Sequence, residues 1–219
     1  MICNFFRRFR LKKGTVERLL QQIEHNLLHR TNRNHCVTLM VQLLLTLRYF
    51  ASGSLYIVAA DFAGVSKATA GKIIAKVTNV IASLRPQYIA LANSEAEQNI
   101  VIDNFYRIAR FPRTIGAIDC THIRIQSPVG DNGYAVRKYL ITPLANPQSP
   151  AENLFNESQI RTRNVIERTF GVWKRRFPIL SVGMRCRISL MQVVIVATAI
   201  LLNLARMENE ELPPDAYIQ

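Results

Sequence analysis

The chain has 219 residues, of which 49% are hydrophobic and 20% charged, and its formal net charge is +13. This composition excludes a disordered chain, and four scattered cysteines without a CxxC pair exclude a disulfide framework and a zinc site of the usual spacing. The positive charge is concentrated in residues 1–35 and 161–187. The rest of the chain has nearly equal numbers of positive and negative residues. Two basic segments in such a chain predict a polyanionic partner, with nucleic acid favoured over an acidic membrane surface.

Apolar residues at helical spacing dominate the first half of the chain. They predict an amphipathic helix over residues 15–28 and a more deeply buried helix over residues 36–51. A further amphipathic helix is expected over residues 93–107. Its inward face would carry four apolar side chains, Ile100, Ile102, Phe105 and Ile108.

Residues 54–84 have the pattern of two helices joined by a tight turn. The first is expected to end near Phe62, Gly64 supplies the turn, and Ser66 is a good N-cap for the second. Six apolar residues of the second helix are expected to face inward: Ala70, Ile73, Ile74, Val77, Ile81 and Leu84. Its opposite face carries the candidate DNA contacts Thr69, Lys72 and Lys76. This arrangement is typical of a helix-turn-helix, and an ordinary helical hairpin is the alternative.

The character of the sequence changes after Pro112. Residues 114–119 form a short apolar run with β-branched residues, and they predict a strand that turns into a hairpin or a second strand. The run ends in Asp119, and a carboxylate at the end of a buried strand is costly unless it is paired or bound to a cation. A hydrogen-bonded turn is the alternative for Asp119. Asp131 lies among turn-forming residues and could simply cap a turn there.

Ser149, Pro150 and Glu152 form a strong helix start, with an N-cap, a proline at the first position and a capping box. The helix they begin carries Glu167, and Asn156 marks a point where it could break. An apolar stripe runs along it through Ile166, Phe170, Trp173 and Phe177. Glu167 could form a weak ion pair with Arg163 one turn earlier. Alternatively it could bind a metal at a phosphate site, with basic side chains holding the nucleic-acid backbone, namely Arg163, Arg168 and Lys174.

Residues 188–205 form the most apolar stretch of the chain. They are barely long enough to span a membrane, and Gln192, Thr198 and Asn203 interrupt them. We therefore expect a buried core helix and no membrane association. The acidic tail from Glu208 onward is expected to be loose.

Four stretches in this order resemble the Harbinger transposase-derived nucleases, which are related to the PIF/Harbinger DDE transposases. They are GAIDCTHI at 116–123, GDNGY at 130–134, YLITPL at 139–144 and RTRNVIERTFGVWKRRF at 161–177. The resemblance implies a ribonuclease H-like domain in which Asp119, Asp131 and Glu167 hold Mg²⁺ or Mn²⁺ for phosphodiester hydrolysis. Asn132 replaces the serine of the family's second stretch. The family also implies DNA as substrate, a Myb-like DNA-binding partner protein, and a nuclear location, with the cytoplasm as a second site.

The chain departs from the family in one region. In the family, several tens of residues with further strands and another metal-binding Asp separate the first stretch from the second, whereas here Ser127 and Pro128 lead almost directly into Gly130. We therefore expect an α+β, mostly helical fold. Residues 1–110 would form a helical, helix-turn-helix-like DNA-binding region, and residues 111–219 an incomplete ribonuclease H-like DDE nuclease domain with few strands.

Two functions follow from this interpretation. The first is a divalent-metal-dependent nuclease, impaired because the catalytic domain lacks a segment. The second is a non-catalytic DNA-binding or adaptor protein that keeps the helix-turn-helix and the basic helix. A product that does not fold well by itself is a third interpretation of the shortened domain.

Overall fold

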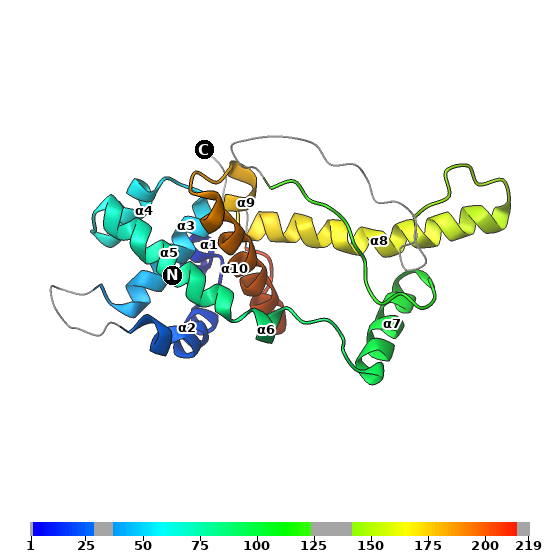
Figure 1. The fold of residues 1–219 in the computed structure, drawn as a ribbon, viewed down its shortest axis with the longest axis horizontal. Helices are drawn as coiled ribbons and strands as arrows, with labels where there is room; N and C mark the ends of the chain where they lie inside the picture. The colour runs from blue at the N-terminus through cyan, green and yellow to red at the C-terminus, as the bar shows by residue number, and fades with distance from the viewer. Residues whose placement is uncertain (1, 29–36, 124–141, 214–219) are drawn as a thin grey trace. The chain divides into compact units, whose positions relative to one another are not determined.

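The computed structural model describes residues 2–28, 37–123 and 142–213, and Figure 1 traces their course. Helices dominate these residues, and one bridge residue, Met184, is the only strand-like residue described. The helices of the described chain are α1 (Ile2–Phe9), α2 (Lys13–Leu27), α3 (Leu39–Ser52), α4 (Tyr56–Ala63), α5 (Lys67–Ser83), α6 (Arg85–Tyr88), α7 (Glu95–Ala109), α8 (Pro150–Arg176), α9 (Ile179–Val182) and α10 (Ile188–Met207). The expectation of a mostly helical fold is confirmed, and the helix-turn-helix and ribonuclease H-like details stay predictions.

The chain divides into two compact units, and neither is continuous in sequence. Unit 1 comprises Met1–Ala90, Ile123–Gln126 and Val172–Gln219, and unit 2 comprises Leu91–His122 and Ser127–Gly171. Helix α8 contributes to both units. The division into residues 1–110 and 111–219 that the sequence suggests stays a prediction.

Unit 1 holds a helical core that the apolar periodicity predicted. Helix α5 packs against α3, α4 and α10, and α2 packs against α3 and α5. The six residues of the α5 region that were expected to face inward are all buried: Ala70, Ile73, Ile74, Val77, Ile81 and Leu84. In α2, Val16, Leu19, Ile23 and Leu27 are buried as well. Burial of this many large apolar side chains is the main stabilising contribution to the unit.

A glycine in the left-handed backbone conformation lies on each side of α4. Gly53 caps α3 with a φ of 62°, and Gly64 caps α4 with a φ of 63°. L-residues with a Cβ atom avoid this region, so both positions favour glycine. At Gly53 a Cβ atom would also lie 3.2 Å from Ile179 Cα and Val182 Cβ, which shows how closely α9 approaches the turn.

Helix α10 is the core helix that the sequence predicted. It is the one described helix whose length and composition would allow it to span a membrane. It packs against α5 and α6, and its buried side chains include Val194, Ile200 and Leu201. The residues that follow it are anchored, because Glu208 pairs with Arg18 and Glu210 is buried. The expectation of a loose tail from Glu208 onward is therefore wrong for these first residues.

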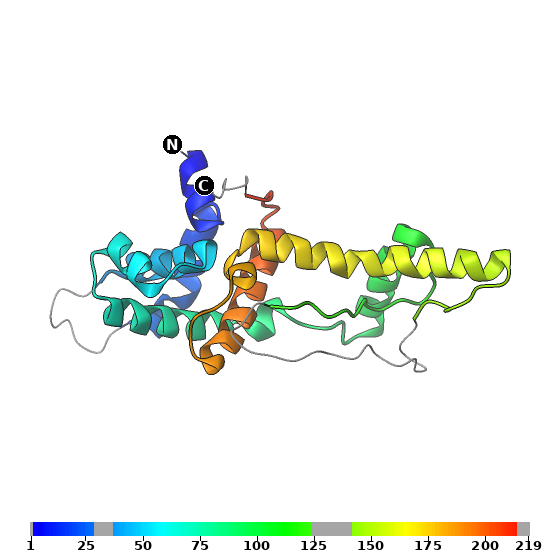
Figure 2. The same cartoon turned by 90° about the horizontal axis from the view of Figure 1, so that it is seen from above.

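Helix α8 runs from Pro150 to Arg176 without the break considered at Asn156, and Figure 2 shows it as one continuous helix. Helix α7 of unit 2 begins at a capping box between Ser94 and Glu97. It buries none of its side chains, and Ile100 and Ile108 are exposed, so the expected inward face is wrong for these two residues. An amphipathic pattern places apolar residues on one face of a helix, but burial also requires a partner surface.

The strand expected over residues 114–119 does not form a ladder in the described chain. Residues 114–123 run without regular secondary structure, and Ile115 and Ile118 are exposed. A strand is stable only when a neighbouring strand satisfies its backbone groups, and no described segment does this. The expected strand over residues 114–119 is therefore wrong, since no described segment pairs with it.

Candidate functional site

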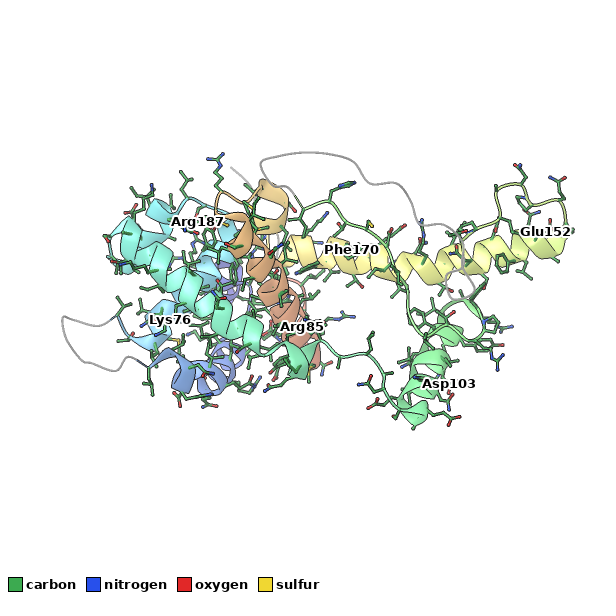
Figure 3. The ribbon with its side chains drawn as sticks, viewed as in Figure 1. Lys76, Arg85, Asp103, Glu152, Phe170 and Arg187 are labelled. Carbon is green, nitrogen blue, oxygen red and sulfur yellow. The ribbon has the colours of Figure 1, made fainter. Side chains whose placement is uncertain are left out.

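The helix that carries Glu167 starts at the predicted capping box. Ser149 Oγ accepts the backbone N–H of Glu152 at 3.2 Å, and Glu152 Oε2 accepts the N–H groups of Gln148 and Ser149 at 2.5 and 3.1 Å. These backbone hydrogen bonds lower the pKa of Glu152 below its ordinary value of 4.5. Figure 3 labels Glu152 in this first turn and Phe170 further along α8. The box fixes where the helix begins, and Glu167 follows about four turns later.

Glu167 is paired within its own helix. Arg163 Nη2 lies 2.8 Å from Glu167 Oε1, and the two side chains are 42% and 43% exposed. The amide of Asn164 donates to Glu167 Oε2 at 3.3 Å in the orientation that also lets it donate to Ile160. The intrahelical ion pair considered from the sequence is therefore present. Exposed pairs of this kind contribute only about 0.3–0.5 kcal/mol, so the contact does not prevent Glu167 from binding another ligand.

Asp119 lies on the extended segment that follows α7. Its Oδ1 accepts the backbone N–H of Cys120 at 2.9 Å, a local contact that matches the turn-like alternative. The residue is half-buried, and no regular secondary structure holds the segment on either side of it. The third predicted acidic residue, Asp131, lies outside the described residues.

The acidic residues do not fit a metal site in the part of the chain that the structure describes. Among residues 2–28, 37–123 and 142–213, no group of three or more His, Cys, Asp or Glu side chains converges. Two-metal hydrolysis needs several carboxylates around cations roughly 3.5–4 Å apart. We therefore derive no catalytic step through a metal from this geometry.

Unit 2 is organised by the first half of α8. Asn156 Nδ2 donates to the Leu144 carbonyl at 2.9 Å, and its Oδ1 accepts the Leu144 N–H at 2.7 Å. Ser158 Oγ donates to the carbonyl of Ala109, the last residue of α7. The rings of Phe111 and Phe155 have centroids 5.4 Å apart. One stretch of α8 thus holds both the chain leading to Asp119 and the chain leading from residue 142.

The basic side chains of α8 have different environments. Arg163 forms an ion pair with Glu167, Arg168 is exposed, and Lys174 is half-buried. Arg176, which the sequence placed in the same basic block, is buried and forms an ion pair with Glu210. The number of α8 cations available to a phosphate backbone is therefore smaller than the sequence indicates.

The predicted DNA contacts of α5 also differ from one another. Ser66 Oγ accepts the Thr69 N–H at 3.2 Å as the predicted N-cap, and Thr69 and Lys72 are exposed just beyond it. Lys76 is half-buried, and its Nζ donates to the Leu27 carbonyl at the C-terminal end of α2, at 2.6 Å. Lys76 thus joins α5 to α2 inside unit 1. Figure 3 labels it on α5.

Comparison with known proteins shows which families the chain is similar to. Residues 126–203 match the DDE superfamily endonuclease family. The chain is 24% identical to the proteins named “Putative nuclease HARBI1” of Homo sapiens and Bos taurus over 223 positions, which cover 73% of this chain and 64% of each relative. The Xenopus laevis protein of that name is 21% identical over 226 positions. These matches support the resemblance to the Harbinger transposase-derived nucleases. No solved structure matches it.

The match to the Harbinger relatives is incomplete in two respects. The chain spans less than two thirds of their length. The alignment runs over 223 positions, whereas 73% of the 219 residues here is about 160 residues, so about 60 aligned positions lack a counterpart in this chain. The endonuclease match includes Asp131 and Glu167 but begins after Asp119. A gap inside the Harbinger alignment is what an internally shortened domain would produce.

Two groups of residues were missed by the interpretation of the sequence. The buried pair of Arg176 and Glu210 joins residues far apart in the chain, and no periodicity signals it. Asn156 was considered only as a helix break, whereas its side-chain amide forms hydrogen bonds with the backbone of Leu144. A pattern in a single sequence does not reveal either contact, because both depend on how distant segments meet.

Proposed function

We propose that this chain derives from a divalent-metal-dependent nuclease that hydrolyses phosphodiester bonds in DNA, and that its catalysis is impaired. The observation that carries the proposal is the set of family-matching acidic motifs combined with about 60 missing aligned positions. By family resemblance, Asp119, Asp131 and Glu167 are the positions at which an intact site would hold Mg²⁺ or Mn²⁺.

The local geometry supports the impairment. Asp119 sits on a segment without a strand partner in the described chain, so nothing described fixes its carboxylate relative to α8. Glu167 pairs with Arg163, but this weak exposed pair does not by itself prevent Glu167 from binding a cation. A bound divalent cation would supply Lewis acidity and an activated water, but only carboxylates held in a fixed constellation can position it.

Mn²⁺ binding measured by isothermal titration calorimetry tests this proposal. The full chain is compared with Glu167→Gln and with the matched control Glu157→Gln, because Glu157 forms the same kind of ion pair with Arg161 on the same helix. We expect weak or no binding by all three proteins and no cleavage of supercoiled DNA. Tight binding and cleavage that disappear only in Glu167→Gln would overturn the impairment and support a complete metal site.

A second candidate, DNA binding without cleavage, is favoured by α4 and α5. Gly64 makes the turn, Ser66 caps α5, and the start of α5 exposes Thr69 and Lys72. A helix with exposed basic and small polar residues near its N-terminus is suited to the major groove. We therefore propose that unit 1 retains DNA affinity, and separately that Arg168 of unit 2 contacts phosphate.

Measuring the affinity of the chain for duplex DNA at several salt concentrations distinguishes DNA binding from no function in DNA binding. Contacts to phosphate release counterions, so the logarithm of affinity falls linearly with the logarithm of salt. Lys72→Met is expected to weaken binding and to reduce that slope by about one. An exposed lysine elsewhere in unit 1, Lys13, provides the matched control Lys13→Met. Equal losses in both variants would indicate a general charge effect instead of a defined interface.

We also propose a nuclear location and a Myb-like DNA-binding partner protein, both from family resemblance. Imaging of a fluorescently tagged chain tests the location. Co-purification with a Myb-like protein from the same cells, compared with an unrelated basic protein, tests the partner.

A further inference from the structure

Residues 114–119 have the composition of a strand but no strand to pair with in the described chain. No hydrogen bond within the described residues joins their backbone groups to the backbone of another segment. After the turn that follows α7, the chain continues without folding back on itself (Figure 1). Backbone N–H and C=O groups left unpaired along an extended segment are a template for pairing with another strand. This segment is therefore a candidate edge for a sheet between chains.

The edge is open on the described surface of unit 2. The exposed fractions of Ile115 and Ile118 are 64% and 65%, and a Cβ atom placed on Gly116 would meet no atom within 4 Å. Soluble proteins commonly block such an edge with a lysine, a proline or a bulge. Residues 114–118 contain no charged residue and no proline. A glycine inside a strand often marks a place where another backbone approaches closely, and Gly116 lies at the middle of this segment.

Opposite charges flank the segment at equal distances from Gly116. Arg113 lies three residues before the glycine and Asp119 three residues after it. No ion pair among the described residues involves either one. The Asp119 carboxylate accepts the N–H of the neighbouring Cys120 at 2.9 Å. Six residues of extended chain span roughly 20 Å, so Arg113 and Asp119 of one chain cannot reach each other along this segment. A second chain running antiparallel would bring them together.

We propose that residues 113–119 pair antiparallel with the same residues of a second copy of this chain, centred on Gly116. The residues that face each other across the two copies are then Arg113 and Asp119, Thr114 and Ile118, Ile115 and Ala117, and Gly116 with itself. Opposite charges that face each other across two strands stabilise the pairing. Shifting the register by one or two residues in either direction separates the charged pairs, so the charges select this register.

A second copy fits this edge better than an unrelated peptide because the edge is complementary to itself. A two-fold interface places the same surface of both subunits together, so a basic group at one end of the segment meets an acidic group at the other. Two short strands form only a marginal sheet, so we expect weak association, with a Kd on the order of 100 µM. This interface goes beyond the proposed function, and it does not depend on whether the chain cleaves or binds DNA.

Charge exchange in the full chain tests the pairing. Arg113→Asp and Asp119→Arg each convert both opposite-charge pairs of the dimer into like-charge pairs, and each should weaken dimerisation at least about fivefold in sedimentation equilibrium. Combined in one chain, the two changes should restore the Kd to within about twofold of the wild type. The two single variants mixed in equal amounts should also associate, because their heterodimer regains both opposite-charge pairs. Aspartate tolerates the left-handed backbone at Arg113, whose φ is 56°.

A general effect of net charge predicts a different outcome. The chain carries a formal net charge of +13, so added negative charge would reduce the repulsion between copies and added positive charge would increase it. That effect alone would strengthen association in Arg113→Asp and weaken it in Asp119→Arg, whereas the proposed pairing weakens both. Arg110→Asp is the matched control, because Arg110 is another exposed arginine with a positive φ, of 54°. It should leave the Kd within about twofold of the wild type, since it lies outside the paired residues.

Disulfide formation tests the register directly. The background variant Cys120→Ser removes an exposed thiol. In that background, Gly116→Cys places a thiol opposite the same thiol of the second copy, within disulfide reach. Ile118→Cys is the matched control, because the two copies of residue 118 would lie roughly 13 Å apart along the strands. Under mild oxidation Gly116→Cys should form a linked dimer at least about tenfold faster, and mass spectrometry of its digest should show two copies joined at residue 116.

Three outcomes would overturn the proposal, once circular dichroism has shown that the variants remain folded. The first is a chain that stays monomeric up to about 1 mM. The second is an equal rate of disulfide formation in Gly116→Cys and Ile118→Cys, which would indicate random collision of exposed segments. The third is association that Arg113→Asp strengthens, or that mixing the two single variants does not restore, which would assign it to another surface.

Discussion

Arg176 and Glu210 form a buried ion pair in unit 1, with Arg176 Nη1 2.9 Å from Glu210 Oε2 and side chains only 2% and 0% exposed. Arg176 also donates to the Arg10 carbonyl at 2.7 Å and to the Glu211 carbonyl at 2.6 Å. Glu210 Oε1 accepts the Lys12 N–H at 2.8 Å. Burial lowers the pKa of Arg176, and the charge of Glu210 opposes that shift. The pair thus joins the end of α8, the link between α1 and α2, and the residues after α10.

Removing one member of this pair should destabilise unit 1 strongly. Arg176→Met leaves the Glu210 carboxylate buried without its cation, and we expect a loss of about 3–5 kcal/mol in the free energy of unfolding. Arg176→Met combined with Glu210→Gln should lose less, because no charge is left uncompensated and the glutamine keeps an acceptor for the Lys12 N–H. Urea unfolding followed by circular dichroism measures these differences.

The exposed pair of Arg18 and Glu208 supplies the matched control for this experiment. Arg18→Met should change the free energy of unfolding by less than about 1 kcal/mol, because water solvates both of its charges. Similar losses in Arg18→Met and Arg176→Met would contradict a special role for the buried pair. So would a double variant that is less stable than Arg176→Met alone.

Lys76 is expected to act chiefly as a structural contact between α5 and α2. Its ammonium binds a carbonyl at the C-terminal end of α2, where positive charge is favourable. Lys76→Met keeps the apolar stem and removes the donor, and we expect a loss of about 1–2 kcal/mol in the free energy of unfolding. Lys72→Met, on the exposed side of the same helix, should stay within about 0.5 kcal/mol. Equal stability of the two variants would show that the Leu27 contact contributes nothing.

Acid should weaken the start of α8 through Glu152. The backbone N–H groups of Gln148 and Ser149 lower the pKa of Glu152 in the folded chain. Its contribution to stability is therefore fully present above the ordinary value of 4.5 and is lost as pH falls through the lower folded-state pKa. The stability advantage of the wild type over Glu152→Gln should accordingly shrink below about pH 4.5. Urea unfolding from neutral pH down to about pH 3 measures it.

A parallel effect is expected at the start of α7. The N–H groups of Asn93 and Ser94 lower the pKa of Glu97 in the same way, so Glu97→Gln should show the same loss of its effect in acid. An advantage of wild type over either glutamine variant that grows as the pH falls would contradict the direction of these shifts.

The features predicted correctly from the sequence are those that short segments determine. Apolar residues at helical spacing located α2, α3 and α5. The capping box of Ser149 and Glu152, together with Ser66, marked where two helices begin, because caps depend on neighbouring residues. The exposure of Ile100 and Ile108 was not predicted, since periodicity shows which face of a helix is apolar but not whether another element covers it.

The candidate site was predictable only as a set of motifs. Family-like residues around Asp119 and Glu167 indicated ancestry, and the comparisons bear out that ancestry. The carboxylates can converge only if a sheet brings them together, and local sequence does not show whether that sheet forms. In the described chain Glu167 pairs with Arg163. Arg176 looked like one more surface cation, because its partner Glu210 lies 34 residues further along the chain.

Asn156 should be the residue that holds residues 142–149 against α8. Its amide both donates to and accepts from the backbone of Leu144, so Asn156→Ala removes two hydrogen bonds, and local opening should become easier by about 1–2 kcal/mol. Hydrogen exchange at the Leu144 amide should therefore accelerate by roughly five- to thirtyfold. Asn156→Asp keeps the acceptor and loses the donor, and should show an intermediate rate. Asn153→Ala, which removes one side-chain bond to Ser149 on the same helix, should leave Leu144 unchanged. Exchange at Leu144 that is equally fast in the wild type and in Asn156→Ala would mean that another contact holds this segment.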